Sequence, residues 1–262
     1  MIPENAITEW RKTVPWHTSE QVEQDLIICK ALSEIYKSEF LATHLAFRGG
    51  TALHKLYLNP QPRYSEDIDL VQINQGPIKP IIDHIREVLS FLGEPIVKQK
   101  KYNNTLIFRF ESEIPPIMPL RLKVEINCME HFNVLGSTKI DFDINNQWYK
   151  AKATITTYKL EELLGTKLRA LYQRRKGRDL FDLYKGLLKT ELNTKEVISC
   201  YHEYMKFSVE KPPTQKEYLL NTDKKNQDSE FIGDIDLLLR PEEVYNPDEA
   251  YQLVRMKLLE KI

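Results

Sequence analysis

The sequence predicts an α+β protein in which a lobe built on a mixed sheet precedes a helical lobe. Between about residue 45 and about residue 155, short apolar runs and alternating segments indicate strands separated by helices. From Thr157 onward, apolar residues recur at helical spacing instead. We therefore expect an α/β domain with an N-terminal helix over residues 1–156 and a helical domain over residues 157–262.

Composition indicates a globular protein of the cytoplasm. The 262 residues are 42% hydrophobic, which is enough for a sizeable core. Because 37 basic residues nearly balance 38 acidic ones, no overall positive field attracts nucleic acid, and such a contact needs a local basic patch. The three cysteines have neither zinc-site nor disulfide-framework spacing, which fits a reducing compartment. We also expect no secretion signal and no membrane span, since no apolar run approaches about 18 residues.

The first third of the chain predicts a long helix, a short strand and a glycine turn. Thr18 and Gln21 form a capping-box pattern that opens a helix over residues 19–40. The apolar run HLAF then predicts a strand that ends in Gly49 and Gly50, and a short helix follows.

Similar patterns predict the remaining elements. Strands are expected at residues 67–73, 94–100, 104–111, 120–129 and 148–155. Helices are expected at residues 78–92, at 159–189 with a break near Gly177, at 194–207 and at 247–261. The polar segment at residues 221–230 is expected to be an exposed loop.

The DID sequence carries the first candidate site. Side chains of a strand alternate between faces, so Asp67 and Asp69 share one face while Ile68 and Leu70 point into the core. At a rise of about 3.3 Å per residue, the two carboxylates are close enough to share a divalent cation such as Mg²⁺. On its own, the motif more often marks a solvated strand edge with two exposed acids.

A third acid strengthens the interpretation as a metal site. In KVEIN, Glu125 shares a strand face with Lys123 and Asn127. If this strand lies beside DIDL, three carboxylates gather, and their mutual repulsion favours a bound cation. Two metal ions about 4 Å apart could then activate an attacking hydroxyl and stabilise a leaving pyrophosphate.

The turn at Gly49 and Gly50 is a candidate phosphate-binding site. Glycines let the backbone approach a triphosphate closely, and the amides and the Thr51 hydroxyl at the start of a helix could donate to it. The pattern matches neither the Walker A motif nor GxGxxG, and a pair of glycines more often only turns the chain.

The helix that starts near Lys159 carries a lysine inside a leucine stripe. Lys167 therefore either snorkels to water or faces a polar cleft that holds phosphates. A basic run follows, which is either a solvated helix face or a contact for RNA phosphates: Arg169, Arg174, Arg175, Lys176 and Arg178. Asp179 and Asp182 come next, and the helical pattern places Asp182 towards solvent.

Four segments together resemble a known family. FRGGTALHKLY, RYSEDIDL, KVEIN and TKLRALYQRRKGRDLFDLY are similar, in this order and spacing, to the AbiEii/AbiGii toxin family of nucleotidyltransferases. The resemblance covers about residues 45–190 and implies the nucleotidyltransferase lobe of the DNA polymerase β-like superfamily. It implies transfer of a nucleotide from an NTP with Mg²⁺, or with Mn²⁺ in its place. It further implies a toxin of a toxin–antitoxin or abortive-infection system, with a cognate antitoxin and the 3′ end of tRNA as acceptor.

The resemblance also implies roles for individual residues. The metal ligands are Asp67, Asp69 and Glu125, and the catalytic residues are these three with Lys167 and Asp182. The nucleotide-binding residues are Gly49, Gly50, Thr51, Arg63, Ser65 and Lys167. Glu125 is either a metal ligand or the general base that accepts the proton of the acceptor hydroxyl.

Two other functions compete with this prediction. The first keeps the enzyme but replaces the RNA acceptor with a hydroxyl of a small molecule or a protein. The second is a non-catalytic regulator that keeps the cleft only to bind nucleotide or RNA. A nuclease of the D…ExK type is disfavoured, because no lysine stands two residues after Glu125.

Overall fold

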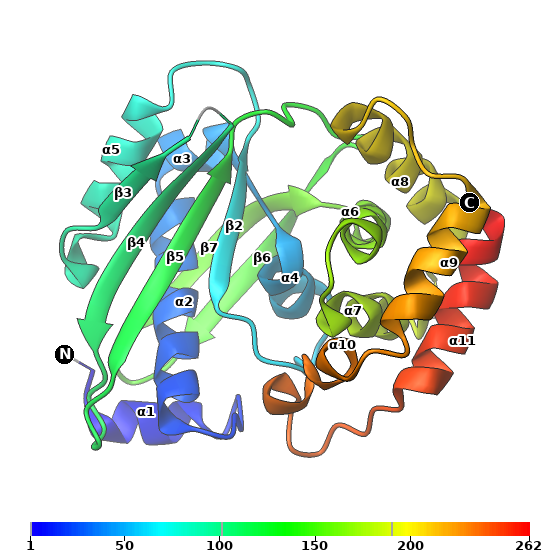
Figure 1. Cartoon of the computed structure of the whole chain (residues 1–262). Coiled ribbons are helices and arrows are strands. Elements are labelled where there is room, and N and C mark those ends of the chain that lie inside the picture. Colours follow the sequence, from blue (N-terminus) through cyan, green and yellow to red (C-terminus); the bar gives the residue numbers. More distant parts are fainter. Residues whose placement is uncertain (1, 101, 190) are drawn as a thin grey trace. The chain divides into compact units, whose positions relative to one another are not determined.

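The chain folds into two compact units. The protein was studied as a computed structural model that describes residues 2–100, 102–189 and 191–262. The first unit comprises Met1–Asn133 and Ser137–Tyr158, and the second comprises Val134–Gly136 and Lys159–Ile262. The division between Tyr158 and Lys159 lies close to the expected boundary at residue 156. The first unit combines a sheet with helices, whereas helices make up the second (Figure 1).

The sheet of the first unit is mixed, as the sequence predicts. Within the described residues its strand order is β3-β4-β5-β2-β1-β7-β6. The parallel pairs are β2 with β5 and β1 with β7, and the other neighbours are antiparallel. The strands are β1 (Leu45–Arg48), β2 (Asp67–Gln72), β3 (Ile96–Gln99), β4 (Asn103–Glu111), β5 (Pro119–Asn127), β6 (Ser137–Asn145) and β7 (Lys150–Tyr158). The sequence prediction lacks β6, although residues 139–145 alternate strictly between polar and apolar residues, and this alternation is the signal that locates the strand.

The first unit contains the long helix for which Thr18 is the N-cap. The helices are α1 (Glu4–Trp10), α2 (Ser19–Lys37), α3 (Glu39–His44), α4 (Gly49–Ala52) and α5 (Lys79–Val88), with a π-helical turn at Leu53–Tyr57 and a 3₁₀ turn at Ser90–Leu92. The capping box is confirmed, because Gln21 N donates to the Thr18 hydroxyl at 3.2 Å and Thr18 N donates to Gln21 Oε1 at 3.3 Å. The expected helix ends at Lys37 rather than residue 40, since Ser38 caps α3 instead.

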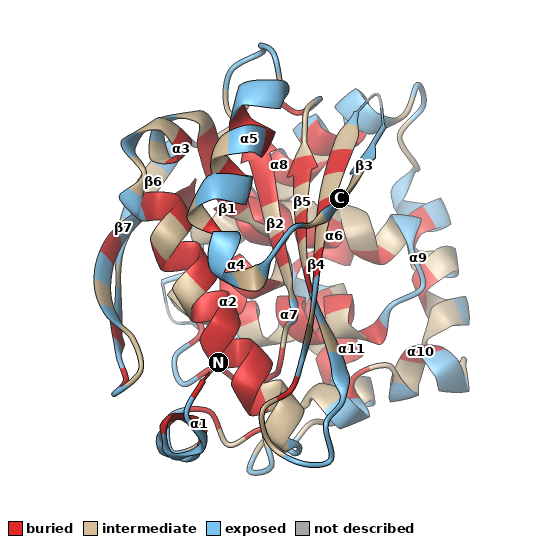
Figure 2. Cartoon of the chain, turned by 90° about the vertical axis from the view of Figure 1, so that its left-hand side faces the viewer, coloured by how far each residue is buried: buried red, intermediate tan, exposed pale blue. Residues whose placement is uncertain are grey.

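The core of the first unit lies between the sheet and α2. This helix contacts β2, β5 and β7, and it buries Leu26, Ile28 and Leu32 completely. Ile68 and Val124 are also fully buried on the central strands. Figure 2 shows the resulting band of buried residues through α2, β2 and β5. The centre of the sheet is therefore a rigid platform for the acids of β2 and β5.

The second unit is a group of packed helices. Its helices are α6 (Leu160–Gln173), α7 (Gly177–Leu187), α8 (Thr194–Ser208), α9 (Gln215–Lys225), α10 (Ser229–Gly233) and α11 (Pro247–Lys257), with 3₁₀ turns at Asp236–Leu238 and Leu259–Lys261. The segment Val134–Gly136 belongs here because Val134 N and Leu135 N each donate to the Glu162 carboxylate at 2.9 Å.

The expected loop at residues 221–230 is wrong, because α9 occupies its first half. Thr214 opens this helix with a capping box in which Glu217 N donates to the Thr214 hydroxyl at 3.3 Å. Tyr218 and Thr222 are fully buried one turn apart, so one face of α9 belongs to the core. The capping-box pattern at Thr214 is the sequence signal that locates this helix.

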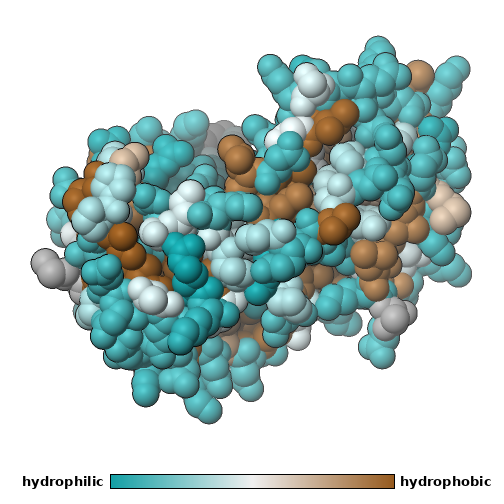
Figure 3. All heavy atoms as spheres, turned by 90° about the horizontal axis from the view of Figure 1, so that it is seen from below, coloured by the Kyte–Doolittle hydropathy of each residue, from teal (hydrophilic) through white to brown (hydrophobic). Residues whose placement is uncertain are grey.

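The surface is mainly polar on the face that Figure 3 shows, with hydrophobic residues in smaller groups. None of the helices in the described part of the chain is both long enough and apolar enough to cross a membrane.

Candidate active site

The strands that carry the acids are neighbours in the sheet. β2 and β5 pair in parallel, with Asp67 opposite Lys123 and Asp69 opposite Glu125. Ile68 and Leu70 are buried, while both aspartates of β2 are partly exposed. The predicted alternation is thus confirmed. The pairing of β2 with β5, which the sequence left open, places Glu125 on the strand next to the two aspartates.

The glycine turn lies directly against Asp69. Arg48, the last residue of β1, pairs with Asp69 in the antiparallel register, and Gly49 follows with a φ of 79°. A Cβ atom at Gly49 would lie 2.2 Å from Asp69 Oδ2. Both the backbone conformation and the close contact therefore require a glycine. The GGT and DID motifs form one site, with Gly49 and Gly50 opening α4 beside the carboxylate.

Thr51 connects the same two motifs from inside the unit. Its hydroxyl donates to the Asp67 carbonyl oxygen at 2.5 Å and lies 2.8 Å from the Ser65 hydroxyl. Thr51 is 1% exposed, so its side chain holds α4 against the start of β2. The phosphate contacts expected of Thr51 and Ser65 stay predictions, because the structure shows these hydroxyls bound to protein atoms.

Arg63 occupies the interior instead of a substrate-facing loop surface. The residue is buried, and its Nη1 donates to the Tyr64 carbonyl oxygen at 2.8 Å. The Gln61 side chain donates in turn to the Arg63 carbonyl oxygen at 2.9 Å. Arg63 therefore orders the loop before β2, and its expected role in nucleotide binding stays a prediction.

Glu125 has a protein cation as its nearest charged partner. Lys123 Nζ lies 2.5 Å from Glu125 Oε1 on the same strand face. Among the described residues, no group of three or more His, Cys, Asp or Glu side chains lies at metal-binding separation. The three acids thus share a face without forming the expected cluster. Asp67 and Asp69 remain as two carboxylates on one face, which is the protein contribution that Mg²⁺ typically needs beside waters and substrate phosphates.

The electrostatics of the site favour a bound cation. Burial raises the pKa of Asp67 to about 6, and the negative charge of Asp69 adds to this effect against the opposing charge of Lys123. A carboxyl group whose charged form is disfavoured in this way gains stability when a cation binds beside it. The Asp67 and Asp69 pair, called here the sheet carboxylates, is therefore chemically suited to a divalent metal.

A buried ionic network that the sequence did not predict supports the helix that follows the glycine turn. Asp25 of α2 accepts hydrogen bonds from Trp10 Nε1 at 2.9 Å, from Trp16 Nε1 at 3.2 Å and from Lys55 Nζ at 2.6 Å. Lys55 lies in the π-helical turn directly after α4. Asp25 therefore fixes the element that carries Gly49, and the available signal was a charged residue on the apolar face of α2.

In the second unit, Lys167 lies inside the helical core. Its Nζ is 3.1 Å from Asp179 Oδ1 and 2.8 Å from Asp182 Oδ2, and all three residues are buried. The expectation that Asp182 faces solvent is wrong, because its carboxylate pairs with the lysine of α6. Lys167 likewise does not snorkel to water, and the triphosphate contact implied for it stays a prediction.

Arg174 completes this group of charges. It binds the Asp179 carboxylate with two nitrogens of its guanidinium, Nε at 2.6 Å and Nη2 at 2.7 Å. Burial raises the pKa of Asp179, but the positive charges of Lys167 and Arg174 outweigh burial and lower it. We call Lys167, Arg174, Asp179 and Asp182 the helical ion-pair group.

The rest of the basic run is also paired within its own unit. Arg175 contacts Asp228, and Lys176 and Arg178 lie 3.2 Å and 3.9 Å from the Asp234 carboxylate. The Arg169 guanidinium lies 5.3 Å from the centre of the Tyr204 ring. The run is therefore an intramolecular network rather than a bare basic face, which weakens its interpretation as an RNA contact.

The glycine turn packs against the DxD strand of a mixed sheet, which is the arrangement that the family resemblance implies. Residues 30–253 match the family described as "Nucleotidyl transferase AbiEii toxin, Type IV TA system". The chain therefore belongs to the AbiEii family of nucleotidyltransferase toxins, as the resemblance predicts, and it is an enzyme rather than a non-catalytic regulator.

Solved structures share the fold at low sequence identity. MenT4, a nucleotidyltransferase toxin from Mycobacterium tuberculosis H37Rv, is 14% identical with a TM-score of 0.65, over 100% of this chain and 91% of that one. JHP933 from Helicobacter pylori is 18% identical with a TM-score of 0.57, over 93% and 95%. A search of curated protein sequences finds no match. At these identities the two structures support the α+β fold.

Proposed function

We propose that the protein transfers a nucleotide from an NTP to the 3′ end of tRNA, with Mg²⁺ bound by Asp67 and Asp69. The contact between Gly49 and Asp69 carries this proposal, because it places a closely approachable backbone turn beside the carboxylate pair. The tRNA acceptor follows the family resemblance. NTPs and tRNA both occur in the cytoplasm, so we place the activity there.

The transfer joins an acceptor oxygen to the α-phosphorus and releases pyrophosphate. Mg²⁺ would neutralise the charge that the phosphate oxygens carry in the transition state. Asp67 and Asp69 would hold that ion, and the backbone at Gly49 and Gly50 would lie against the triphosphate. Glu125 accepts the proton of the acceptor hydroxyl, a role that we favour over metal binding because Lys123 already holds one of its oxygens.

Lys167 and Asp182 act in this proposal as positioning residues. Lys167 lies on α6 and Asp182 on α7, so their ion pair fixes the two helices relative to each other. A cognate antitoxin of the type IV system counteracts the toxin, and its expression restores growth.

The test is an assay with each labelled NTP, Mg²⁺ and total tRNA. We expect one NTP to label tRNA, EDTA to stop the reaction, and Asp67→Ala and Asp69→Ala to lower the rate by about a thousandfold or more. Glu66→Ala removes an exposed acid next to the pair and is the matched control, which keeps its activity. In cells, growth arrest by the wild type is lost with Asp69→Ala.

Two results would contradict the proposal. The nucleotidyl transfer is refuted if no NTP labels any acceptor, or if both alanine variants match the wild type. The tRNA acceptor is refuted if label enters only small molecules or protein.

A further inference from the structure

A pocket lies within the second unit, lined by α6, the turn after it and α9. Its volume is about 540 Å³, inside the range of about 300 to 1,000 Å³ for small-molecule sites. Six of its lining residues are Tyr172, Arg175, Glu217, Asn221, Lys224 and Lys225. Neither the family resemblance nor the proposed transfer uses this pocket.

One face of α9 forms most of the pocket wall. Glu217, Asn221 and Lys224 recur at spacings of four and three residues, so they project from the same side of the helix. Tyr218 and Thr222 lie on the other side, where both are fully buried. The division of α9 into a core face and a pocket face explains why a segment so rich in polar residues is helical.

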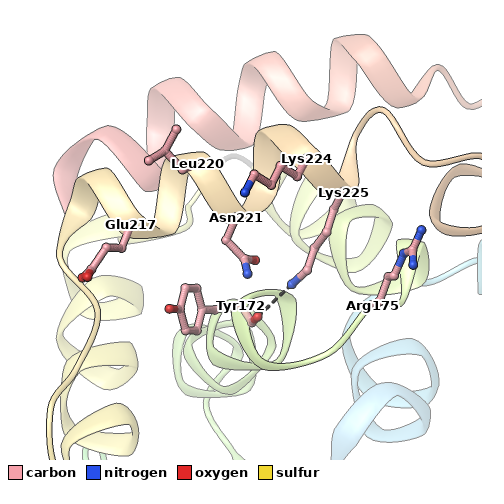
Figure 4. A pocket seen from close by; sticks show the side chains of 7 residues that line it. All are labelled: Tyr172, Arg175, Glu217, Leu220, Asn221, Lys224 and Lys225. Atoms are coloured by element: carbon pink, nitrogen blue, oxygen red, sulfur yellow. Dashed lines mark hydrogen bonds between the residues drawn. The ribbon is translucent and has the colours of Figure 1, made fainter.

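Lys225 makes the pocket rigid. Its Nζ donates to the carbonyl oxygen of Leu171 at 2.5 Å, at the last turn of α6. It also donates to the carbonyl oxygen of Tyr172 at 2.7 Å (Figure 4). These carbonyls have no partner within their own helix, and the negative end of the helix dipole favours a cation there. Burial lowers the pKa of Lys225 to about 8. This lysine therefore ties α9 to α6 and leaves ligand binding to its neighbours.

Asn221 has an unused hydrogen-bonding atom at this wall. Its Oδ1 is buried, and no donor among the described residues reaches it. In Figure 4 the Asn221 side chain points from α9 towards the ring of Tyr172. An unpaired buried acceptor destabilises the folded chain unless a ligand or water supplies a donor. Asn221 thus contributes to the pocket wall an amide group whose oxygen has no protein donor among the described residues.

The lining groups match the parts of a nucleotide. Aromatic rings stack on bases, amide side chains bind base edges, and lysines attract phosphates. Lys224 is exposed on the pocket face of α9, whereas Arg175 is held by Asp228. We propose that this pocket binds one unpaired nucleotide of the RNA acceptor, with its base on Tyr172, the edge of the base against the Asn221 amide and its phosphate beside Lys224. The identity of the strand as an acceptor rests on the proposed function.

The test measures binding of a short, fluorescein-labelled, single-stranded RNA of mixed sequence to the full-length protein, without NTP or Mg²⁺. We expect Tyr172→Leu to weaken binding about tenfold, because it removes the stacking surface. Lys224→Glu should weaken binding and lower the slope of log affinity against log salt concentration by about 0.7 for one lost phosphate contact. Lys216→Glu is the matched control, since this exposed lysine of α9 does not line the pocket.

Asn221→Leu separates a binding role from a structural one. It replaces an unpaired acceptor with an apolar group, so thermal stability should stay equal or rise while RNA binding weakens. In the transfer assay the same variant should raise KM for RNA and leave kcat near the wild-type value. If Asn221→Leu and Tyr172→Leu bind RNA as tightly as the wild type, the pocket is not an RNA site, whether or not the enzyme transfers nucleotides.

Competition distinguishes the sources of the ligand. Free AMP and inorganic phosphate are each added to the wild-type complex with labelled RNA. Little displacement by either at concentrations where unlabelled RNA competes fully supports a nucleotide within a strand. Displacement by AMP alone at RNA-like concentrations assigns the pocket to a free nucleotide and overturns the proposal, and displacement by phosphate alone overturns the role of the base.

Discussion

The sheet carboxylates and the helical ion-pair group use the same kinds of side chain in opposite ways. On β2, Asp67 and Asp69 are partly exposed, and the nearby Lys123 is already bound to Glu125. The pKa of Asp67 is raised to about 6, chiefly by burial, and the charge of Lys123 offsets this only in part. Such a site is completed by a cation from outside the chain.

In the helical ion-pair group, the chain supplies its own cations. Lys167 and Arg174 hold Asp179 at distances between 2.6 Å and 3.1 Å, and the pKa of this acid is lowered despite burial. The difference teaches that the net effect of burial and neighbouring charges decides whether an acid is suited to an added cation, since this effect raises the pKa of Asp67 and lowers that of Asp179. The predictions below test this contrast, from the largest expected effect to the smallest.

Removing the buried lysine should strongly destabilise the second unit. Lys167→Met leaves two fully buried carboxylates with one cation fewer, so we expect the free energy of unfolding to fall by about 3 to 5 kcal/mol. Asp67→Asn, by contrast, should leave stability unchanged or raise it, because it removes a charge that the folded state disfavours. Urea unfolding followed by circular dichroism measures both.

A double variant serves as the control for this comparison. Adding Asp182→Leu to Lys167→Met removes one of the two acids that lost the lysine, so it should restore part of the lost stability. The contrast between the two groups breaks down if Lys167→Met is neutral, or if Asp67→Asn costs as much as Lys167→Met.

Two glycines with nearly the same positive φ should respond differently to a methyl group. Gly49 and Gly93 have φ values of 79° and 78°, but a Cβ at Gly93 would meet nothing within 4 Å. Gly93→Ala should therefore cost about 1 to 3 kcal/mol through backbone strain alone, because its ψ of -167° lies in a region that only glycine readily adopts. Gly49→Ala should cost a further 1 to 3 kcal/mol, roughly, since its Cβ displaces Asp69, and it should abolish most of the transfer activity. Equal losses of stability and activity in the two variants would show that the contact with Asp69 is unimportant.

The affinity of the sheet carboxylates for Mg²⁺ should depend on pH. Protons compete with the cation at Asp67, so affinity should fall by up to about tenfold for each unit below a pH of about 6 and level off above it. Without Mg²⁺ the sign for stability is reversed. The folded carboxyl binds its proton more tightly than the unfolded one, whose pKa is about 3.9, so stability decreases as pH rises from about 4 to about 6.

Calorimetric titration with Mg²⁺ on both sides of pH 6 measures this effect. Asp67→Asn should remove the pH dependence in this range, while Glu66→Ala should keep it. An affinity that stays constant through pH 6 would place the cation away from Asp67.

Local patterns predicted the elements that carry the site. The capping box of α2 and the alternation of DIDL act over two to four residues, so they can be recognised without any knowledge of partners. Apolar periodicity did not reveal α9, because Tyr218 contributes to a core that forms only when the helices pack together. It failed in the same way at Asp182, whose buried position depends on Lys167 of another helix.

The sequence by itself determined the α+β class, the shared strand face of Asp67 and Asp69, and the membership in a nucleotidyltransferase family. Only the tertiary structure decided that Gly49 touches Asp69, that Lys123 holds Glu125, and that Lys167 and Arg174 pair with Asp179. The physical reason is that face and period are properties of a single segment. Charge compensation, in contrast, depends on side chains that meet only when distant segments pack together.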